Sequence, residues 1–232
     1  MWMRCLLLAV AVGLPSPTAV PAAEKPEHLA GWGKPTDPDG DCKIKLDKKV
    51  LTMKLPGAAH DFAGELERWN APRVMSKVDG DFILEVKVSG TFAPTPESTI
   101  PGRLAYNGAG ILLVSDKDNH LSLQRGAVNF GDRTRHYLNF ELRKDAKLPI
   151  SLYEVELEDK PVFLRVERRG GKVYGMGSHD GVKWQSYDPI EVDFPPALEV
   201  GVVGISSSKG LFDCELEGLT LFRKAEIKEP GK

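Results

Sequence analysis

The stretch DFILEVKV, residues 81–88, places apolar side chains at every second position. Four of them share one face of an extended chain: Phe82, Leu84, Val86 and Val88. The charged side chains of Glu85 and Lys87 fall on the opposite face. Successive side chains of a strand point to opposite faces of its sheet, so this pattern predicts a strand with one face buried.

Segments of the same kind recur along the chain, separated by turns rich in Gly and Pro. KIKL and VLTMKL predict a hairpin across residues 47–49. The later segments are GILLV, HLSLQ, HYLNFEL, VFLRVER, KVYGM, LEVGVVGI and FDCELEGLTLF. In the last of these the apolar face changes parity at Gly218, which predicts a bulge or bend. A helical period is absent, and strands spaced by about 8–12 residues favour an all-β sandwich.

Residues 1–23 have the composition of a secretory signal peptide. Arg4 precedes an apolar run too short to span a bilayer, and VPAA (20–23) offers small residues for cleavage. We therefore expect a secreted or periplasmic protein with no membrane insertion. The expected organisation is an N-terminal arm (24–41), one β-sandwich domain (42–225) and a C-terminal tail (226–232).

Composition excludes one class of partner. Apolar residues make up 41% of the chain and charged residues 28%, which is ordinary for a globular protein. The formal net charge of -2 provides no basic excess to neutralise phosphates. Nucleic acid is therefore not an expected partner.

Two cysteines, Cys42 and Cys214, follow the expected signal peptide. Each shares a strand face with apolar neighbours, so both thiols are expected to point toward the core. They could be buried free thiols, which behave as small hydrophobic groups. Alternatively, in an oxidising compartment they could form a disulfide between the first and last strands, and both interpretations stay open.

The stretch SHDGVKW, residues 178–184, predicts a further hairpin. Asp180-Gly181 is typical of a type I′ turn, which needs positive φ at both central positions. Two longer irregular stretches, 56–80 and 90–107, interrupt the pattern of strands. Loops of that length in a sandwich often carry function.

A set of motifs in fixed order resembles a known family. They are W-G-x-P-x-DPDGDC (32–42), L-P-G-x-x-HDF (55–62), W-NAPRV (69–74), GDFILEVKV (80–88), YNGAGILLVSDKDNHLSLQR (106–125), FLRVERRGGKV (163–173), GSHDGVKW (177–184) and LEVGVVGISSS (198–208). Together they resemble the family catalogued as domain of unknown function 1349, in the concanavalin A-like lectin/glucanase superfamily. The resemblance implies a jelly-roll sandwich of two antiparallel sheets, one of them concave, with carbohydrate binding or cleavage as the common theme. It also implies that Trp184 packs against a sheet.

Strand parity defines a candidate ligand face. In HLSLQ and HYLNFEL the leucines point inward, which sends polar side chains to the opposite face. Planar polar groups and aromatic rings suit the hydroxyls and faces of a sugar, although an ordinary exposed sheet face can look the same. The predicted ligand residues on strands are His120, Gln124, Tyr137, Asn139, Arg165 and Tyr174. Those predicted on loops at one rim are His60, Asp61, Trp69, Asn70 and Arg73.

Catalysis has one candidate. YEVELED spaces Glu154, Glu156 and Glu158 at alternate positions, and so resembles the Glu-x-Asp-x-Glu strand of laminarinase-type members. The central Asp is replaced by Glu, and Pro149 and Pro161 flank the segment. A connecting strand with a solvated acidic face explains the pattern equally, so no catalytic residue is assigned.

A metal site has a weaker basis. Asp37, Asp39 and Asp41 in TDPDGDC imitate the start of a calcium loop, but no Glu follows at the twelfth position. Asp and Pro also form turns without any ion. No cofactor is expected, and a structural calcium at this turn is the alternative.

The sequence therefore predicts an exported, non-catalytic sandwich that binds a glycan or similar extracellular ligand on its concave sheet. A glycoside hydrolase or lyase is the alternative, and a structural or adhesion protein without a small ligand is the third. Binding without release of reducing sugar separates the first from the second.

Overall fold

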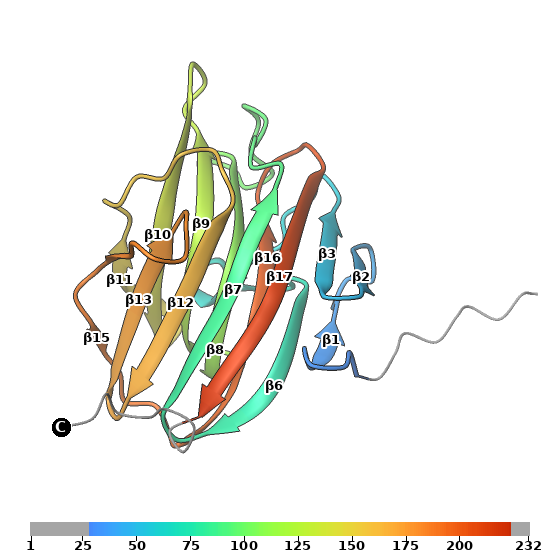
Figure 1. Cartoon of the computed structure of the whole chain (residues 1–232). Helices are drawn as coiled ribbons and strands as arrows, with labels where there is room; N and C mark the ends of the chain where they lie inside the picture. Colours follow the sequence, from blue (N-terminus) through green and yellow to red (C-terminus); the bar gives the residue numbers. More distant parts are fainter. Residues whose placement is uncertain (1–27, 224–232) are drawn as a thin grey trace, which may run out of the picture.

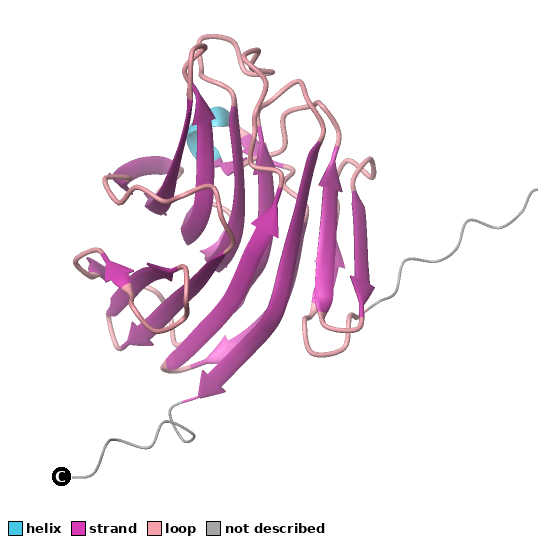
Figure 2. Cartoon of the chain, turned by 45° about the horizontal axis from the view of Figure 1, so that its top comes forward, coloured by secondary structure: helices cyan, strands magenta, loops and turns pink. Residues whose placement is uncertain are grey.

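A computed structural model describes residues 28–223 as two large antiparallel sheets stacked face to face (Figure 1). The expected signal peptide (1–23) and C-terminal tail (226–232) lie outside the described residues. Helix within the described range is one short turn, η1 (Gly64–Leu66), and strands dominate the chain (Figure 2). The predicted all-β jelly-roll sandwich is confirmed. Within this range, no helix has the length and apolar character needed to cross a membrane.

The first sheet has seven strands. In spatial order they are β1 (Lys34–Thr36), β6 (Arg73–Asp79), β16 (Ala197–Ser206), β8 (Tyr106–Asp116), β9 (Asn119–Asn129), β10 (Thr134–Lys144) and β11 (Lys147–Leu152). Every pair of neighbours is antiparallel. Strands β8, β9 and β10 follow one another in sequence, so two tight connections set the register of three of the seven strands.

The second sheet has eight strands. In spatial order they are β14 (Gln185–Ser186), β13 (Lys172–Ser178), β12 (Val162–Arg169), β7 (Phe82–Gly90), β17 (Phe212–Arg223), β3 (Val50–Leu55) and β2 (Lys43–Asp47), and β15 (Ile190–Glu191) also pairs with β13. The predicted hairpin across residues 47–49 is β2–β3. The predicted irregularity at Gly218 is also confirmed, because the β17–β7 register shifts between Glu217 and Thr220 and Gly218 has φ of 68°.

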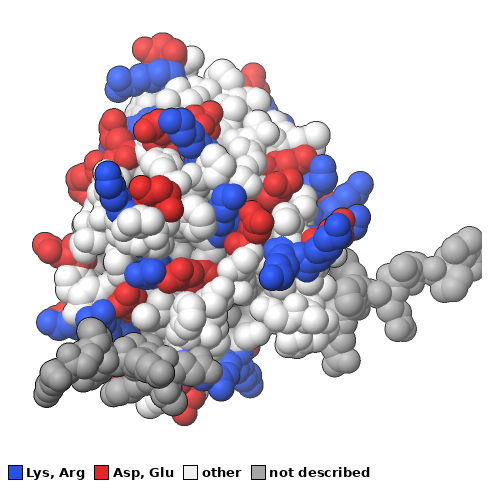
Figure 3. Space-filling model, in the orientation of Figure 1, with Lys and Arg blue, Asp and Glu red and all other residues white. Residues whose placement is uncertain are grey.

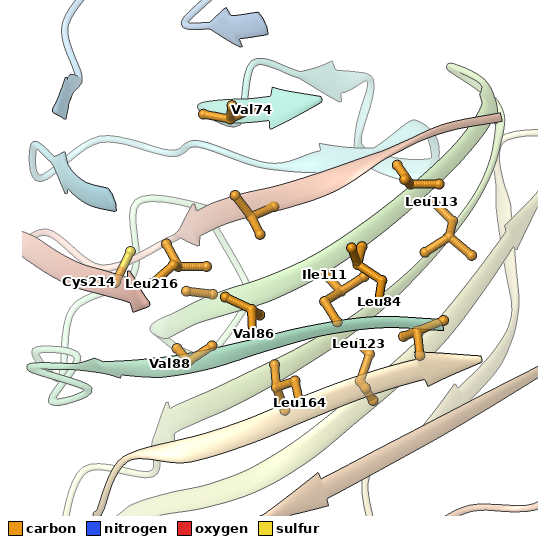
Figure 4. Close-up of a cluster of buried hydrophobic side chains, with 14 of the residues drawn as sticks. Val74, Leu84, Val86, Val88, Ile111, Leu113, Leu123, Leu164, Cys214 and Leu216 are labelled. Carbon is orange, nitrogen blue, oxygen red and sulfur yellow. The ribbon is translucent and has the colours of Figure 1, made fainter. Parts of the chain in front are cut away.

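The core lies between these two sheets (Figure 4). Leu84, Val86 and Val88 of β7 are at most 2% exposed, as the alternation in residues 81–88 predicted. Ile111 and Leu123 face them from the seven-stranded sheet. Full burial of one such side chain contributes about 1.5–3 kcal/mol relative to its exposure. Opposite charges are interspersed on the face drawn in Figure 3, in keeping with the small net charge.

The N-terminal arm predicted at 24–41 is, from residue 28 on, part of the sandwich. Strand β1 pairs with β6, and Trp32 is only 6% exposed in the core. Its indole is too large and apolar to be left in water at the edge of the sheet.

Of the two interpretations left open for Cys42 and Cys214, the structure has the buried free thiols, and the disulfide is wrong. Cys214 lies on β17 opposite Met53 of β3, whereas Cys42 immediately precedes β2. Strand β3 therefore separates the two cysteines. Strands two apart in a sheet lie about 10 Å from each other, beyond the Cα separation of about 7 Å that a disulfide can span. Burial raises the pKa of the Cys214 thiol to about 12.

The hairpin expected at SHDGVKW is confirmed as β13–β14, but its two-residue type I′ turn is wrong. Only Gly181 has positive φ there, at 73°. The Asp180 carboxylate instead accepts hydrogen bonds from the backbone N–H of Val182 and Lys183, both at 2.8 Å. These bonds stabilise a longer loop. Trp184 is half-buried beneath the Arg165 guanidinium, 4.3 Å from the ring centroid.

Candidate functional site

The outer face of the seven-stranded sheet is partly covered by the segment 61–71. This segment contains η1 and the small hairpin of β4 (Phe62–Ala63) and β5 (Arg68–Trp69). Its apolar side chains, Phe62 and Ala71, pack on the outward-facing Leu112, Val203 and Ile205. The segment thus forms a raised wall along one side of the sheet.

A pocket of about 380 Å³ lies beside this wall. Its polar floor comes from β8, β9 and β10: Tyr106, Gln124, Tyr137, Asn139, Glu141 and Arg143. Asp61 and Glu65 line it from the wall, and Ile100, Arg103 and Leu104 line it from the other long loop. Its volume lies in the range of small-ligand sites. Both irregular stretches singled out in the sequence therefore border one pocket.

Tyr106 lies flat across β8 and β9 because two facing positions lack a side chain. A Cβ added at Gly126 would lie 2.9 Å from the Tyr106 hydroxyl, and one at Gly108 would collide with that hydroxyl. The hydroxyl donates to the Gln124 Oε1 at 2.9 Å and accepts from the Asn139 Nδ2 at 3.3 Å. Burial raises the pKa of Tyr106 well above its usual range, so the phenol stays a proton donor. This network fixes the amides of the floor.

Arg143 joins the wall to the floor. Its Nε and Nη2 donate to the two Glu65 oxygens, both at 3.1 Å, and its Nη1 donates to Glu141 at 2.8 Å. Burial acts against the charge, yet the adjacent carboxylates raise the pKa of Arg143 above its ordinary value. The guanidinium charge is thus already satisfied inside the protein.

The Asp61 carboxyl group, at the pocket edge, has a raised pKa. Burial raises the pKa of Asp61 to about 6, while the Arg143 charge acts in the opposite direction. Its Oδ1 accepts from the backbone N–H of Phe62 at 2.7 Å. The Asn70 side chain accepts from the Asp61 backbone N–H at 3.0 Å and so helps to hold the loop in place.

The Tyr137 hydroxyl has no hydrogen-bond partner among residues 28–223. Its ring lies 6.3 Å from the Tyr106 ring and below the Arg135 guanidinium. Burial raises the pKa of this phenol, which therefore stays protonated. Tyr137 offers a ligand a hydroxyl beside an aromatic face.

Four of the predicted ligand residues line this pocket: Asp61, Gln124, Tyr137 and Asn139. Five others lie around the wall instead: His60, Trp69, Asn70, Arg73 and His120. The His120 Nε2 donates to the Phe62 carbonyl at 2.8 Å, and the Arg73 Nη1 donates to the Ala71 carbonyl at 3.0 Å. The Trp69 indole donates to the Lys117 carbonyl at 3.0 Å. These contacts position the wall.

Arg165 and Tyr174 do not belong with this group. They lie on β12 and β13, in the eight-stranded sheet. Arg165 pairs with Glu85 at 2.7 Å, and the Arg169 guanidinium covers the Tyr174 ring at 5.1 Å. Strand alternation correctly places Arg165 and Tyr174 on an outer face, but that face belongs to the eight-stranded sheet, whereas the pocket lies on the seven-stranded sheet.

Tyr106, Glu65 and Arg143 were missed by the sequence analysis. The parity that selects Tyr137 and Asn139 also reaches Arg143, so extending it by two strand positions finds this residue. Glu65 and Tyr106 carry no such signal. Their place depends on how η1 folds back and on the glycines that face Tyr106.

The acidic stretch 153–159 lies outside the pocket, in the connection between β11 and β12. Glu154, Glu156 and Glu158 are exposed, while Leu157 between them is buried. Glu156 pairs with Arg135 at 3.2 Å. The arrangement is that of a solvated acidic face.

The turn at 37–41 does not gather its three carboxylates around one point. Asp37 accepts from the backbone N–H of Gly40 and Cys42, both at 3.1 Å. Asp39 accepts from the Asn70 amide at 2.6 Å. Asp41 turns toward His60, 2.9 Å from the ring Nε2. Asp37 and Asp39 thus form turn and loop contacts, and the start of a calcium loop is not formed.

Known structures share the fold. A functionally unknown protein from Saccharomyces cerevisiae matches 78% of this chain and 91% of its own, with 17% identity and a TM-score of 0.64. The GH43 protein BlXynB from Bacillus licheniformis matches 78% of this chain, with 12% identity and a TM-score of 0.55. A xylan β-1,4-xylosidase from Bacillus halodurans C-125 matches 90%, with 12% identity and a TM-score of 0.54.

This chain spans 38% and 41% of the lengths of those two Bacillus proteins. No protein-family model matches the chain, and no curated protein matches it either. The class defined by fold and site is a jelly-roll sandwich of two antiparallel sheets with a polar pocket on one outer face. The resemblance to domain of unknown function 1349 stays a prediction.

Proposed function

We propose that this chain is an exported protein that binds a carbohydrate in the pocket beside segment 61–71 and does not cleave it. The observation that carries the proposal is the set of side chains gathered there. The free Tyr137 hydroxyl, the Asn139 amide and the Asp61 carboxyl offer both donors and acceptors within one small pocket. Sugar hydroxyls need such mixed partners, and the ring of Tyr137 offers a surface for stacking.

The charges favour a neutral or basic sugar over an acidic one. Three carboxyl groups line the pocket, from Asp61, Glu65 and Glu141. Arg143 is already bonded to two of them, and Arg103 is exposed at the rim. A uronate would meet unbalanced carboxylates, and like charges in a partly buried site repel each other.

A hydrolase or lyase is a second candidate, favoured by Asp61. A carboxyl group whose pKa is raised to about 6 by burial is suited to general acid catalysis near neutral pH. The fold likeness to a xylan β-1,4-xylosidase is compatible with either candidate. Release of reducing sugar from bound glycans, lost in Asp61→Asn, would favour the enzyme.

Binding is tested first on a glycan array with the mature chain and then by isothermal titration. Tyr137→Phe removes only the free hydroxyl, so affinity should fall about 5- to 10-fold, the loss of one hydrogen bond. Tyr174→Phe is the matched control on the other sheet and should bind as the wild type does. Equal affinity of Tyr137→Phe and wild type contradicts the placement of the ligand. A chain that binds no glycan supports the structural or adhesion alternative.

A further inference from the structure

A second group of side chains lies outside the pocket, where the turn between β1 and β2 meets the loop before β4. The Asp41 carboxylate, the Cys42 thiol and the His60 imidazole each offer one metal-ligating atom, all within 4.8 Å of one another. The Asp41 Oδ1 is 2.9 Å from the His60 Nε2 and 3.5 Å from the Cys42 Sγ. His60 is fully buried and Cys42 is 6% exposed. Asp41 closes the group on its solvent side.

Two oxygen atoms orient the His60 imidazole toward the group. Its Nδ1 lies 3.2 Å from the Ala58 carbonyl oxygen, and its Nε2 faces the Asp41 carboxylate. Both oxygens accept, and an imidazolium can donate to both of them. A neutral imidazole with its single N–H on Nδ1 donates to the Ala58 carbonyl and turns its Nε2 lone pair toward Asp41. That lone pair is available to a cation between Nε2 and Oδ1, and an Nδ1–H bonded to a carbonyl is the usual arrangement behind a metal-ligating histidine.

The three donor atoms are one sulfur, one nitrogen and one oxygen, and this set selects among metals. Ca²⁺ prefers six to eight oxygens, which excludes it here. Zn²⁺ takes Cys sulfur at about 2.3 Å and His nitrogen or carboxylate oxygen at about 2.0–2.1 Å, in tetrahedral geometry. Those bond lengths place S and O about 3.5 Å apart and N and O about 3.3 Å apart. The S–O distance already agrees, the N–O distance is about 0.4 Å too short, and the S–N distance is at most 4.8 Å.

We propose that Asp41, Cys42 and His60 bind one Zn²⁺, with water in the fourth position. Binding replaces the thiol proton of Cys42, which leaves to solvent, and the ion takes the Nε2 lone pair of His60. The ion ties the turn that carries Asp41 to the loop that continues into Asp61 of the pocket wall. This site does not rest on the proposed carbohydrate ligand.

The test uses the mature chain without an affinity tag, titrated with ZnCl₂ by calorimetry and with Co²⁺ by absorption spectroscopy. We expect one Zn²⁺ per chain, a thiolate-to-cobalt charge-transfer band in the near ultraviolet, and a Tm that rises with added zinc. Cys42→Ser should abolish the charge-transfer band. Cys214→Ser, which alters the other buried free thiol, should retain it.

Asp41→Asn keeps the test valid if Cys42→Ser fails to fold, because the Asp41 side chain is 42% exposed. Loss of this ligand should weaken zinc binding by about 100-fold or more, because removing even a group that only hydrogen-bonds to a metal ligand typically weakens binding by about 10- to 100-fold. Asp47→Asn, an exposed carboxylate on β2, is its control and should bind as the wild type does. A wild-type chain that binds no zinc, a cobalt complex without the thiolate band, or unchanged affinity in Asp41→Asn would each overturn the proposal.

Discussion

Replacing Arg143 with Met should destabilise the protein strongly, because the carboxylates of Glu65 and Glu141 beside the pocket lose their positively charged partner. The Arg143 side chain is 8% exposed, and its partners Glu65 and Glu141 are 20% and 14% exposed. Removing one partner of a buried ion pair costs about 3–5 kcal/mol. The carboxylates keep some contact with water, so we expect about 3 kcal/mol. For a domain of this size that is a fall in Tm of about 6–12 °C.

Thermal melts of wild type and Arg143→Met at pH 5 and pH 8 check this expectation. The deficit should be smaller at pH 5, because Asp61, whose pKa burial raises to about 6, is then mostly protonated and no longer depends on the Arg143 charge. Adding Glu65→Gln and Glu141→Gln to the variant should restore part of the loss. The control is Arg165→Met, whose pair with Glu85 is 27% and 29% exposed and should contribute about 1 kcal/mol or less. Equal losses for the two Arg variants would refute the reasoning.

Other substitutions test the surroundings of the pocket and the core. Burial raises the pKa of Asp61 in the folded protein to about 6, so the free energy of unfolding of the wild type falls as pH rises from about 4 through 6. In denaturant titrations, Asp61→Asn should be about 2–3 kcal/mol more stable than the wild type at pH 8 and equally stable at pH 4. Gly201→Ala should prevent folding, as measured by circular dichroism, because the added Cβ would collide with the Val74 backbone carbonyl. Gly171→Ala is the control: its added Cβ would lie 3.4 Å from the nearest atom, so stability should change by about 0.5 kcal/mol or less. Phe140→Ala, at a fully buried position, should cost about 3–5 kcal/mol in the same titrations, and a loss below 1 kcal/mol would contradict its place in the core.

The sequence predicted much of the core because one physical rule governs it. Alternation in residues 81–88 identified the buried face of β7, and the same rule identified the inward leucines of β9 and β10. The change of the apolar face at Gly218 was also visible in the sequence, because a backbone position with φ of 68° favours glycine. Each of these features depends on neighbours within a few residues.

The candidate site was predicted only in part. Parity found Gln124, Tyr137 and Asn139, which lie on adjacent strands joined by one tight turn. It also selected Arg165, which faces outward from the wrong sheet. Glu65 was missed because its position beside Arg143 depends on a segment 78 residues away in the chain.

The sequence by itself determined which apolar side chains of β7, β9 and β10 face the core, because apolar side chains at alternate positions of a strand leave water together. Only the tertiary structure decided which strands are neighbours. Hydrogen bonding between distant segments put β3 between β2 and β17, which kept Cys42 from Cys214. The same kind of pairing, with η1 folded back on the sheet, brought Asp61 and Glu65 to Tyr106, Tyr137 and Arg143. Such contacts are chosen by the free energy of the whole fold, and no local pattern carries them.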